Sequence, residues 1–299
     1  MNSRHFLTLD DLSAKELADL LARSIDMKRR RVTGQPLAGK VVAMIFEKSS
    51  TRTRVSFESG VAQLGGTTLF LSPRDMHLDR GEPLEDTARV MSRMVDAIVI
   101  RANHHEMVER FAAHSRVPVI NALTDRYHPC QLLADVQTWI EHRGPVAGKS
   151  AAWIGDGNNV CHSWIEAARL FGFQLHIATP AGYEPKPEIV GGSNYVTLTH
   201  DPADAARGVD LIVTDTWASM GQESEKTKRA QAFQGFQVTP ALMRLAEDNA
   251  LFMHCLPAYR GQEVAADVID GPQSVVWDEA ENRLHAQKAL LEFLLKTER

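Results

Sequence analysis

Short β-rich apolar runs alternate with helical patterns along almost the whole chain. The apolar run Val41 to Phe46 is followed by a helical pattern from Thr53 to Leu64. The run Ala151 to Ile154 is followed in the same way by a helical pattern from Val160 to Phe171. Strands that alternate with helices predict parallel βαβ units, so we expect an α/β fold.

The alternation is interrupted at the Gly/Pro-containing stretch Arg143 to Lys149 and then starts again. A chain of 299 residues suits about two domains of about 150 residues each. We predict two parallel-sheet α/β domains, residues 1–143 and 144–299, with an inter-domain cleft. The final helical pattern, near residues 280–299, is expected to return to the first domain. Ligands bind such sheets beyond the carboxyl ends of the strands, which directs attention to the residues after each strand.

Composition excludes several classes of protein. The net charge of -5 does not favour nonspecific nucleic-acid binding. The chain has three cysteines, Cys130, Cys161 and Cys255. This small and odd number argues against a disulfide framework and indicates a reducing, cytoplasmic compartment. No apolar run approaches the ~20 residues of a membrane-spanning helix, and none near the start suits a signal peptide. We therefore expect a cytoplasmic globular protein without a nucleic-acid or membrane partner.

Hydroxyl and guanidinium groups are concentrated where the first predicted strand ends. Six successive residues lead into a helix there: Ser49, Ser50, Thr51, Arg52, Thr53 and Arg54. Free backbone N–H groups at a helix start, hydroxyl donors and planar guanidinium groups all suit a phosphate. The spacing of a P-loop is absent, so we predict a site for a small phosphate rather than for a nucleotide. The alternative is a hydroxyl N-cap with solvated arginines.

Further hydrogen-bond donors follow later strands of the first domain. Arg101 comes directly after the strand candidate Ala97 to Ile100, and His128 and Gln131 follow the next strand. We expect these donors to gather at the edge that carries the phosphate site, where they can stabilise the oxyanion formed when a carbonyl is attacked. The alternative for His128, which precedes a proline, is a turn or cap residue.

Neither a metal nor a nucleotide cofactor is favoured. His104 and His105 are adjacent, but the chain has no His-x-x-x-His helix motif and no Cys-x-x-Cys. Gly155 and Gly157 resemble half of a dinucleotide fingerprint, but Val160 stands where its third glycine belongs. We interpret the two glycines as a tight βα turn and expect no metal and no cofactor.

Polar residues also follow strands of the second domain. Asn159 offers an amide after the first strand, and Asp215 ends a later strand, where it can accept hydrogen bonds from a ligand ammonium group. Ser219 and Met220 in the next loop add backbone groups. An aspartate in this place is also a common helix cap, and Cys255, between a strand and a proline, is more often a structural cysteine.

Together these segments resemble the aspartate/ornithine carbamoyltransferase family over essentially the whole chain. Ser50-Thr51-Arg52-Thr53-Arg54 matches the family's carbamoyl-phosphate motif, and His128-Pro129-Cys130-Gln131 matches its second motif. Its ornithine branch is marked by Asp215 through Ser219-Met220-Gly221 and by His254-Cys255-Leu256-Pro257-Ala258. The resemblance implies transfer of the carbamoyl group of carbamoyl phosphate to the δ-amine of L-ornithine, giving L-citrulline and phosphate in arginine metabolism.

The resemblance also implies the roles of individual residues. Carbamoyl phosphate would be bound by Ser50, Thr51, Arg52, Thr53, His77, Arg101, His128, Gln131, Cys255, Leu256 and Arg283. Ornithine would be bound by Asn159, Asp215, Ser219 and Met220. The catalytic residues would be Arg101 and His128, which polarise the carbonyl, and Asp215 and Cys255, which orient the amine.

The resemblance further implies a homotrimer, or a multiple of trimers, in which the loop Ser72 to Pro83 reaches the site of a neighbouring subunit. That loop departs from the family pattern, since His77 stands where Gln is frequent and Asp79 where Gly is frequent. A histidine can still donate to phosphate, so His77 remains the expected contact from the adjacent subunit. Asp79 brings a negative charge close to that contact.

Other functions remain open at this point. The same chemistry on putrescine or N-acetylornithine is the nearest, although the Ser-Met-Gly loop favours a free α-amino acid. Aspartate is less favoured as the acceptor, because the Cys255 segment suits an amine on a long side chain. A noncatalytic carbamoyl-phosphate sensor is expected to lack His128 or Cys255, and both are present. An NAD-dependent dehydrogenase is the alternative at the level of the fold.

Overall fold

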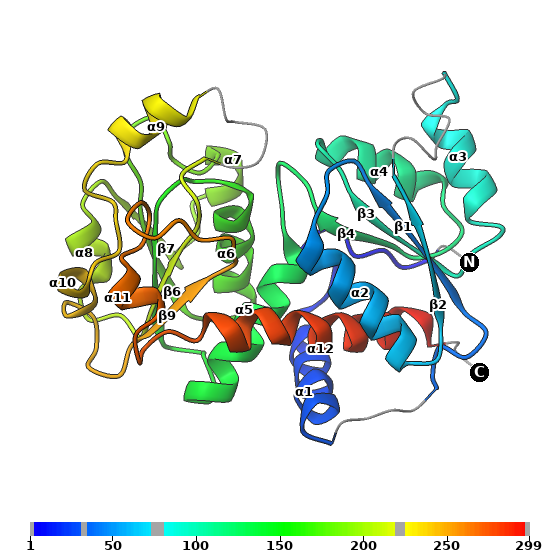
Figure 1. Ribbon diagram of the computed structural model, residues 1–299, viewed down its shortest axis with the longest axis horizontal. Coiled ribbons are helices and arrows are strands. Elements are labelled where there is room, and N and C mark those ends of the chain that lie inside the picture. Colours follow the sequence, from blue (N-terminus) through cyan, green and yellow to red (C-terminus); the bar gives the residue numbers. More distant parts are fainter. Residues whose placement is uncertain (1–2, 31–34, 73–80, 219–224, 297–299) are drawn as a thin grey trace. The chain divides into compact units, whose positions relative to one another are not determined.

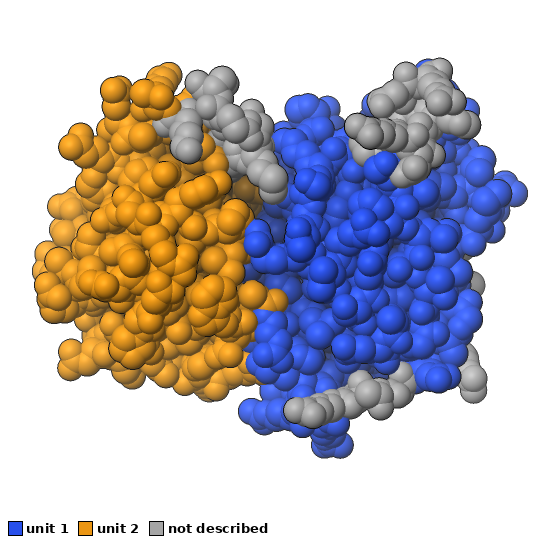
Figure 2. Space-filling model, viewed as in Figure 1, with its two compact units in different colours: residues 1–137, 281–299 blue, residues 138–280 orange. Residues whose placement is uncertain are grey.

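The computed structural model describes residues 3–30, 35–72, 81–218 and 225–296 (Figure 1). The chain forms two compact units (Figure 2). Unit 1 comprises Met1–Gln137 and Glu281–Arg299, and unit 2 comprises Thr138–Ala280. The domain boundary expected from the sequence lies at the end of a helix, residues 129–143, whereas the boundary between the units falls inside that helix.

Unit 1 is built on a four-stranded parallel sheet with the strand order β2-β1-β3-β4. Its strands are β1 (Val41–Phe46), β2 (Thr67–Leu71), β3 (Ala97–Arg101) and β4 (Val119–Leu123). Its helical elements are η1 (Leu9–Asp11), α1 (Ala14–Arg30), α2 (Thr51–Gln63), α3 (Leu84–Met91) and α4 (His105–His114), with the start of α5 (Pro129–Arg143) and most of α12 (Val276–Leu295). Buried aliphatic and aromatic side chains of the sheet, α3 and α4 form one core, which includes Ile98, Ile100 and Phe111.

The register of this sheet aligns the carboxyl ends of three strands. Phe46 is level with Arg101, and Arg101 is level with Leu123, with a register shift between Ile100 and Arg101. The segments that follow β1, β3 and β4 therefore leave the sheet at one edge. These are the segments in which the sequence concentrates its phosphate-binding and carbonyl-polarising candidates.

The last helix, α12, is tied into unit 1 from residue 281 onward. Arg23 on α1 pairs with Glu292, with 2.9 Å between Nε and Oε2. The ammonium group of Lys28 donates to Asn282 Oδ1 at 2.8 Å. A Cβ atom on Gly60 of α2 would lie 3.2 Å from Lys288 Cγ, so α2 and α12 pack closely. The end of the chain therefore completes the unit that its beginning starts (Figure 1).

Unit 2 is built on a five-stranded parallel sheet with the order β7-β6-β5-β8-β9. Its strands are β5 (Ser150–Ile154), β6 (Gln174–Ala178), β7 (Val196–Thr199), β8 (Leu211–Thr214) and β9 (Leu251–His254). Its helices include α6 (Asn159–Phe171), α7 (Pro187–Val190), α8 (Pro202–Ala206), α9 (Lys226–Ala232), α10 (Pro240–Met243) and α11 (Ala266–Ile269). Two parallel sheets with covering helices confirm the predicted fold class.

The core of unit 2 contains a group of large aromatic side chains. Trp139, Trp164 and Phe173 are fully buried. Their rings meet edge to face, with centroids 5.1 Å apart for Trp139 and Phe173 and 5.7 Å apart for Trp164 and Phe173.

In the sheet of unit 2, Thr214 is level with His254, so the residues after β8 and β9 leave at the same edge. Asp215 and Cys255 are the first residues beyond that edge.

The helical spacing of apolar residues from Leu9 to Arg30 predicts one amphipathic helix, and this prediction is wrong in one respect, because the structure divides the segment into η1 and α1. Ser13 and Glu16 form a capping box at the break. The Ser13 backbone N–H donates to Glu16 Oε2 at 2.9 Å, and the Glu16 backbone N–H donates to Ser13 Oγ at 3.3 Å. A Ser-x-x-Glu sequence is a known signal for the start of a helix, so the break was readable from the sequence.

Among the described residues, no helix combines the length and the apolar character that crossing a membrane requires.

Candidate active site

The segment after β1 forms the start of α2 around Ser50. Ser50 is the N-cap residue, and its hydroxyl accepts a hydrogen bond from the Thr53 backbone N–H at 3.3 Å. The Ser50 and Thr53 hydroxyl oxygens are 3.0 Å apart. Thr51 is exposed, Arg52 is half-buried, and the first turn contains no acidic residue. The cap interpretation holds for Ser50, while the positive end of the helix dipole and the Arg52 charge leave the turn suited to an anion.

Arg283 joins this helix start to the second motif. Its Nη1 donates to Gln131 Oε1 at 2.7 Å, and its Nη2 donates to Thr53 Oγ1 at 3.0 Å. Gln131 in turn donates through Nε2 to Asp135 Oδ1 at 2.8 Å. All four side chains are buried. Residues from α2, α5 and α12, which are far apart in the sequence, therefore form one hydrogen-bonded group in unit 1.

His128 and Arg101 are also buried, each 4% exposed. Burial holds the pKa of His128 well below its usual range, and the charges of Arg283 and Arg101 lower this pKa further. His128 therefore stays neutral at pH 7 and can donate a hydrogen bond without carrying charge. Two guanidinium groups close to a neutral imidazole make this part of unit 1 able to bind an anion and to polarise a carbonyl oxygen.

Cys130 takes no part in this electrostatic arrangement. Burial raises the pKa of its thiol to about 12, with Arg283 opposing the shift. The thiol donates to the Asn121 carbonyl oxygen at 3.4 Å. It is a structural side chain of the second motif.

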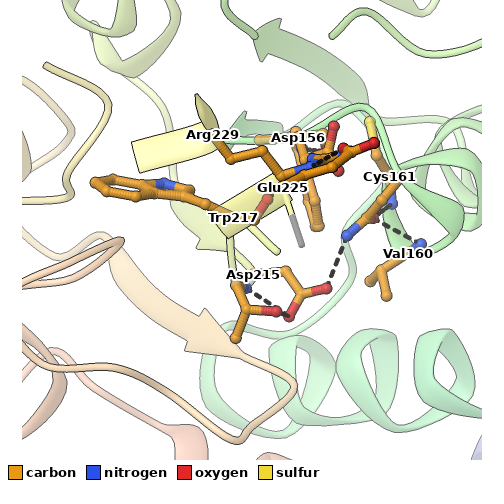
Figure 3. Close-up of polar contacts among 10 residues, drawn as sticks. Asp156, Val160, Cys161, Asp215, Trp217, Glu225 and Arg229 are labelled. Carbon is orange, nitrogen blue, oxygen red and sulfur yellow. Dashed lines mark hydrogen bonds and ion pairs between the residues drawn. The ribbon is translucent and has the colours of Figure 1, made fainter. Parts of the chain in front are cut away.

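In unit 2, hydrogen-bond donors surround the carboxylate of Asp215 (Figure 3). Asn158 Nδ2 donates to Asp215 Oδ2 at 2.8 Å, and the Thr216 backbone N–H donates to Oδ1 at 2.7 Å. The Cys255 thiol donates to the same Oδ1 at 3.2 Å. Asp215 therefore links the ends of β5, β8 and β9, and the thiol lies against a carboxylate.

Asn158 makes this contact and the helix cap together. Its Oδ1 accepts from the backbone N–H groups of Val160 and Cys161, at 2.9 and 3.1 Å, as the N-cap of α6. Asn159, which was predicted from the sequence as a site residue, is the first residue of α6 and is half-buried. Asn158 was missed as a contact of Asp215, although it stands in the same Asn pair.

Cys255 and Leu256 lie in a turn that His254 holds. The imidazole Nδ1 of His254 accepts from the Leu256 backbone N–H at 2.9 Å, and its Nε2 lies 3.1 Å from Glu263 Oε1. Leu256 has a positive φ of 56° and precedes a cis proline. Glu279 accepts from the His254 backbone N–H at 2.9 Å. No sequence motif predicted that Glu263 and Glu279 would contact His254.

A second polar group lies beside Asp215, around Arg229 (Figure 3). Arg229 Nη1 lies 2.8 Å from Asp156 Oδ2 and donates to the Trp217 carbonyl oxygen at 2.9 Å. Its Nε donates to Glu225 Oε2 at 3.1 Å. Burial raises the pKa of Asp156 to about 6, which Arg229 opposes, while Asp215 and Glu225 raise it further.

Arg229 thereby fixes the backbone two residues after Asp215. Neither Asp156 nor Arg229 was predicted from the sequence as a site residue. Asp156 could have been found, because it follows β5 at the edge that also carries Asp215. Arg229 lies on a short helix with no motif around it, and only the folded chain shows its role.

The Gly155 and Gly157 turn has the structural role that the sequence indicated. Gly155 has a φ of +145°. A Cβ atom on Gly157 would lie 2.2 Å from the backbone nitrogen of Pro185, and the Gly157 N–H donates to the Tyr183 carbonyl oxygen at 2.8 Å. Close approach of the 183–185 backbone therefore requires glycine at position 157.

Asp215, His254 and Cys255 offer ligand atoms within 4.8 Å of one another, which is close enough for a metal ion. Both ring nitrogens of His254 are engaged, one with the Leu256 N–H and the other with Glu263. The Cys255 thiol is engaged with Asp215. The geometry therefore favours a hydrogen-bonded cluster over a metal site. His77, Asp79, Ser219 and Met220 lie outside the described residues.

Family models account for nearly the whole chain. Residues 4–141 match the aspartate/ornithine carbamoyltransferase carbamoyl-P binding domain, and residues 147–294 match the Asp/Orn binding domain of the same family. The chain belongs to the aspartate/ornithine carbamoyltransferase family. The first domain model carries Thr53, Arg101 and His128, and the second carries Asp215 and Cys255. The buried donors of unit 1 therefore fall in the carbamoyl-P binding domain of the family, and the Asp215–Cys255 pair falls in the Asp/Orn binding domain.

Individual carbamoyltransferases are similar over their full length. The chain is 64% identical to an ornithine carbamoyltransferase from Methylococcus capsulatus over 296 residues, covering 99% of each chain. It resembles a crystal structure of ornithine carbamoyltransferase from Burkholderia thailandensis with 51% identity and a TM-score of 0.91, covering 98% of this chain and 99% of the other. A crystal structure of acetylornithine transcarbamylase complexed with acetylcitrulline is more distant, with 32% identity and a TM-score of 0.87 over 98% and 99% of the chains.

Proposed function

We propose that this chain acts as an ornithine carbamoyltransferase, which converts carbamoyl phosphate and L-ornithine into L-citrulline and phosphate. The observation that carries the proposal is the contact of Cys255 Sγ with Asp215 Oδ1 at 3.2 Å, because both residues belong to the ornithine-branch motifs. The similar chains from Methylococcus capsulatus and Burkholderia thailandensis, both named ornithine carbamoyltransferase, support the same assignment.

Carbamoyl phosphate is assigned to unit 1. The phosphate would bind at the start of α2 through Ser50, Thr51, Arg52 and Thr53, where helix N–H groups and a guanidinium are available. The carbamoyl group would be held by Arg101, His128 and Gln131, with Arg283 fixing Gln131. His77 of an adjacent subunit, together with Cys255 and Leu256, completes the proposed set.

L-Ornithine is assigned to unit 2, through Asn159, Asp215, Ser219 and Met220. Its δ-amine resembles lysine, with a free pKa near ~10.4, and must lose a proton before it attacks. Asp215 and Cys255 would orient this nitrogen, and Arg101, His128 and Thr53 would stabilise the tetrahedral oxyanion. The neutral nitrogen forms a C–N bond to the carbamoyl carbon, and the C–O bond to phosphate then breaks. The departing phosphate takes the further proton that the nitrogen loses once this bond has formed.

We infer direct transfer rather than a carbamoyl–cysteine intermediate. Phosphate is already a good leaving group, and the Cys255 thiol donates its hydrogen to the Asp215 carboxylate. A carbamoyl adduct trapped on Cys255 of the wild type and detected by mass spectrometry would refute direct transfer. Cys255→Ser should retain part of the activity, because a hydroxyl can make the same hydrogen bond.

The deciding experiment is a citrulline assay with carbamoyl phosphate and three amines offered side by side: L-ornithine, N-acetylornithine and putrescine. The proposal expects kcat/KM to be highest for L-ornithine. A preference for N-acetylornithine or putrescine would show that L-ornithine is the wrong acceptor, while the proposed carbamoyl transfer would stand. Absence of product with every amine would overturn the proposed function.

A homotrimer and a cytoplasmic location belong to the same proposal. In unit 1, β2 is the edge strand of its sheet, and apolar side chains at Leu69 on β2 and Val55 on α2 are exposed. An apolar edge strand is a suitable surface for contact with a second copy. Light scattering on the purified protein should give the mass of three chains or a multiple of it. The mass of one chain would overturn the trimer.

A further inference from the structure

Thr124 closes the turn that leads from β4 to His128. Its backbone N–H donates to the Tyr127 carbonyl oxygen at 3.0 Å. Its hydroxyl oxygen lies 3.4 Å from the Arg126 backbone nitrogen and 3.3 Å from the Tyr127 backbone nitrogen and accepts from both. One threonine therefore fixes the backbone on both sides of the turn. His128 directly follows Tyr127, the last residue of this turn.

His105, the first residue of α4, holds Thr124 and the turn from outside. Its Nδ1 lies 3.0 Å from Thr124 Oγ1, and its backbone N–H donates to Asp125 Oδ1 at 2.9 Å. Its ring packs edge to face against Tyr127, with centroids 5.1 Å apart. His105 is buried, and α4 lies beside β4 in unit 1 (Figure 1). Three separate contacts thus join one histidine to three of the four residues of the turn.

The direction of the side-chain hydrogen bond follows from the Thr124 hydroxyl. Its oxygen accepts from two backbone N–H groups, and its own hydrogen can go to His105 Nδ1 at 3.0 Å or to the Tyr127 carbonyl oxygen at 3.4 Å. We assign the nearer atom, Nδ1, as the acceptor, which puts the ring hydrogen on Nε2, 3.7 Å from Glu109 Oε1.

Burial lowers the pKa of His105, with Glu109 and Asp125 opposing the shift and Arg126 adding to it. The neutral ring is the form that can accept the hydrogen of Thr124. The lowered pKa thus supports a neutral ring, and the shorter hydrogen bond assigns its hydrogen to Nε2.

We propose that His105 is a positioning residue for the reaction, which fixes His128 by accepting a hydrogen bond from Thr124 and so holding the turn from Thr124 to Tyr127. The inference rests on the proposed function, in which His128 polarises the carbamoyl carbonyl. A catalytic donor displaced by about 1 Å can lose roughly a hundredfold in rate, so a residue that fixes its turn contributes to kcat without contacting substrate.

The test compares two substitutions of similar size at position 105. His105→Leu fills the buried space but has no acceptor, whereas His105→Gln keeps a carbonyl oxygen that can accept from Thr124. In the citrulline assay, His105→Leu should lower kcat roughly tenfold and leave the KM for ornithine within about twofold. His105→Gln should keep kcat within about threefold. Glu106→Gln is the control, since Glu106 is the next residue of α4 and its side chain is exposed.

A double-mutant cycle with His128→Ala separates positioning from loss of folded enzyme. If His105 acts through His128, His105→Leu should reduce the remaining kcat by less than about twofold in the His128→Ala background. A partly unfolded population would instead lower kcat by the same factor in both backgrounds. Equal losses in the two backgrounds, or equal kcat for the Leu and Gln variants, would overturn the proposal.

Thr124 provides the second pair if His105→Leu does not fold. Thr124→Ser keeps the hydroxyl and should stay within about threefold of the wild-type kcat, whereas Thr124→Val should lose roughly tenfold. Equal kcat for Thr124→Val and Thr124→Ser contradicts the inference. A wild type that makes no citrulline defeats the proposed function instead, so the two failures are distinguishable.

Discussion

Arg283, near the start of the last helix, donates from Nη2 to the hydroxyl of Thr53 at 3.0 Å, across 230 positions of the sequence. Its other terminal nitrogen binds Gln131, so the guanidinium holds one side chain from each proposed half of the carbamoyl-phosphate site. Arg283→Gln should therefore raise the KM for carbamoyl phosphate about 10- to 100-fold, the range expected when charged hydrogen bonds are lost. Initial rates at saturating ornithine measure it.

Lys296→Gln is the control for Arg283→Gln, because it removes one positive charge just after the same helix, at an exposed position. Its KM for carbamoyl phosphate should equal that of the wild type. Equal KM values for the wild type and Arg283→Gln would show that the hydrogen bonds to Thr53 and Gln131 do not shape the site.

Asn158→Ala tests the link between the cap of α6 and Asp215. Loss of the cap should lower the free energy of unfolding by about 1 kcal/mol. Loss of the 2.8 Å bond to Asp215 should also raise the KM for ornithine and leave that for carbamoyl phosphate unchanged. Asp201→Ala is the matched control, since Asp201 caps α8 in the same unit through the Ala203 N–H at 2.8 Å. An unchanged KM for ornithine in Asn158→Ala would contradict the assignment of Asp215.

Asp156 should make the stability of the protein depend on pH. Because burial raises its pKa to about 6, from the ordinary 3.8, the folded chain keeps a proton that the unfolded chain has released. Its contribution to the free energy of unfolding therefore falls as pH rises from about 4 to about 6, by up to about 3 kcal/mol. Urea denaturation across this range should show the wild type losing stability relative to Asp156→Asn. Asp248→Asn, at an exposed position, should show a constant difference.

Gly157→Ala should destabilise the protein severely. The new Cβ would lie 2.2 Å from the Pro185 nitrogen and 2.4 Å from the Glu184 carbonyl carbon, so backbone must move. Overpacking of this kind costs about 3 kcal/mol of unfolding free energy. Gly148→Ala meets nothing within 4 Å but has a φ of +77°, so it should lose only about 1 kcal/mol. Thermal unfolding of the two variants measures the difference, and similar losses would mean that the 183–185 backbone yields easily.

The fold was largely readable from the sequence because fully buried parallel strands are uniformly apolar. The predicted runs Val41–Phe46 and Ala151–Ile154 both lie within a residue of the observed strands. The candidates at the strand ends were readable for the same reason, since a parallel sheet places the carboxyl ends of its strands at one edge. Ser50 and Asp215 follow a strand in this way, and Arg101 ends one.

The rest of the site could not be read, because it depends on contacts between segments with no motif of their own. Arg229 reaches Asp156 from a short helix, and Glu263 reaches His254 from a loop. Sequence patterns indicate hydrophobic periodicity and the residues that start and end helices and strands. Neither kind of pattern specifies which distant side chain forms a hydrogen bond with a given buried polar group. His105 shows the limit most clearly, since the sequence offered it only a metal-binding role, which was not favoured, and its proposed role emerges only from its contact with Thr124.

Because α12 belongs to unit 1 from residue 281 onward, that unit is not a continuous stretch of chain. During synthesis, the whole of unit 2 leaves the ribosome before Asn282 and Arg283 are available to Lys28 and Thr53. A nascent chain can therefore build its second sheet while its first unit still lacks a helix. The capacity to hold a phosphorylated substrate would then be among the last properties that a growing chain acquires.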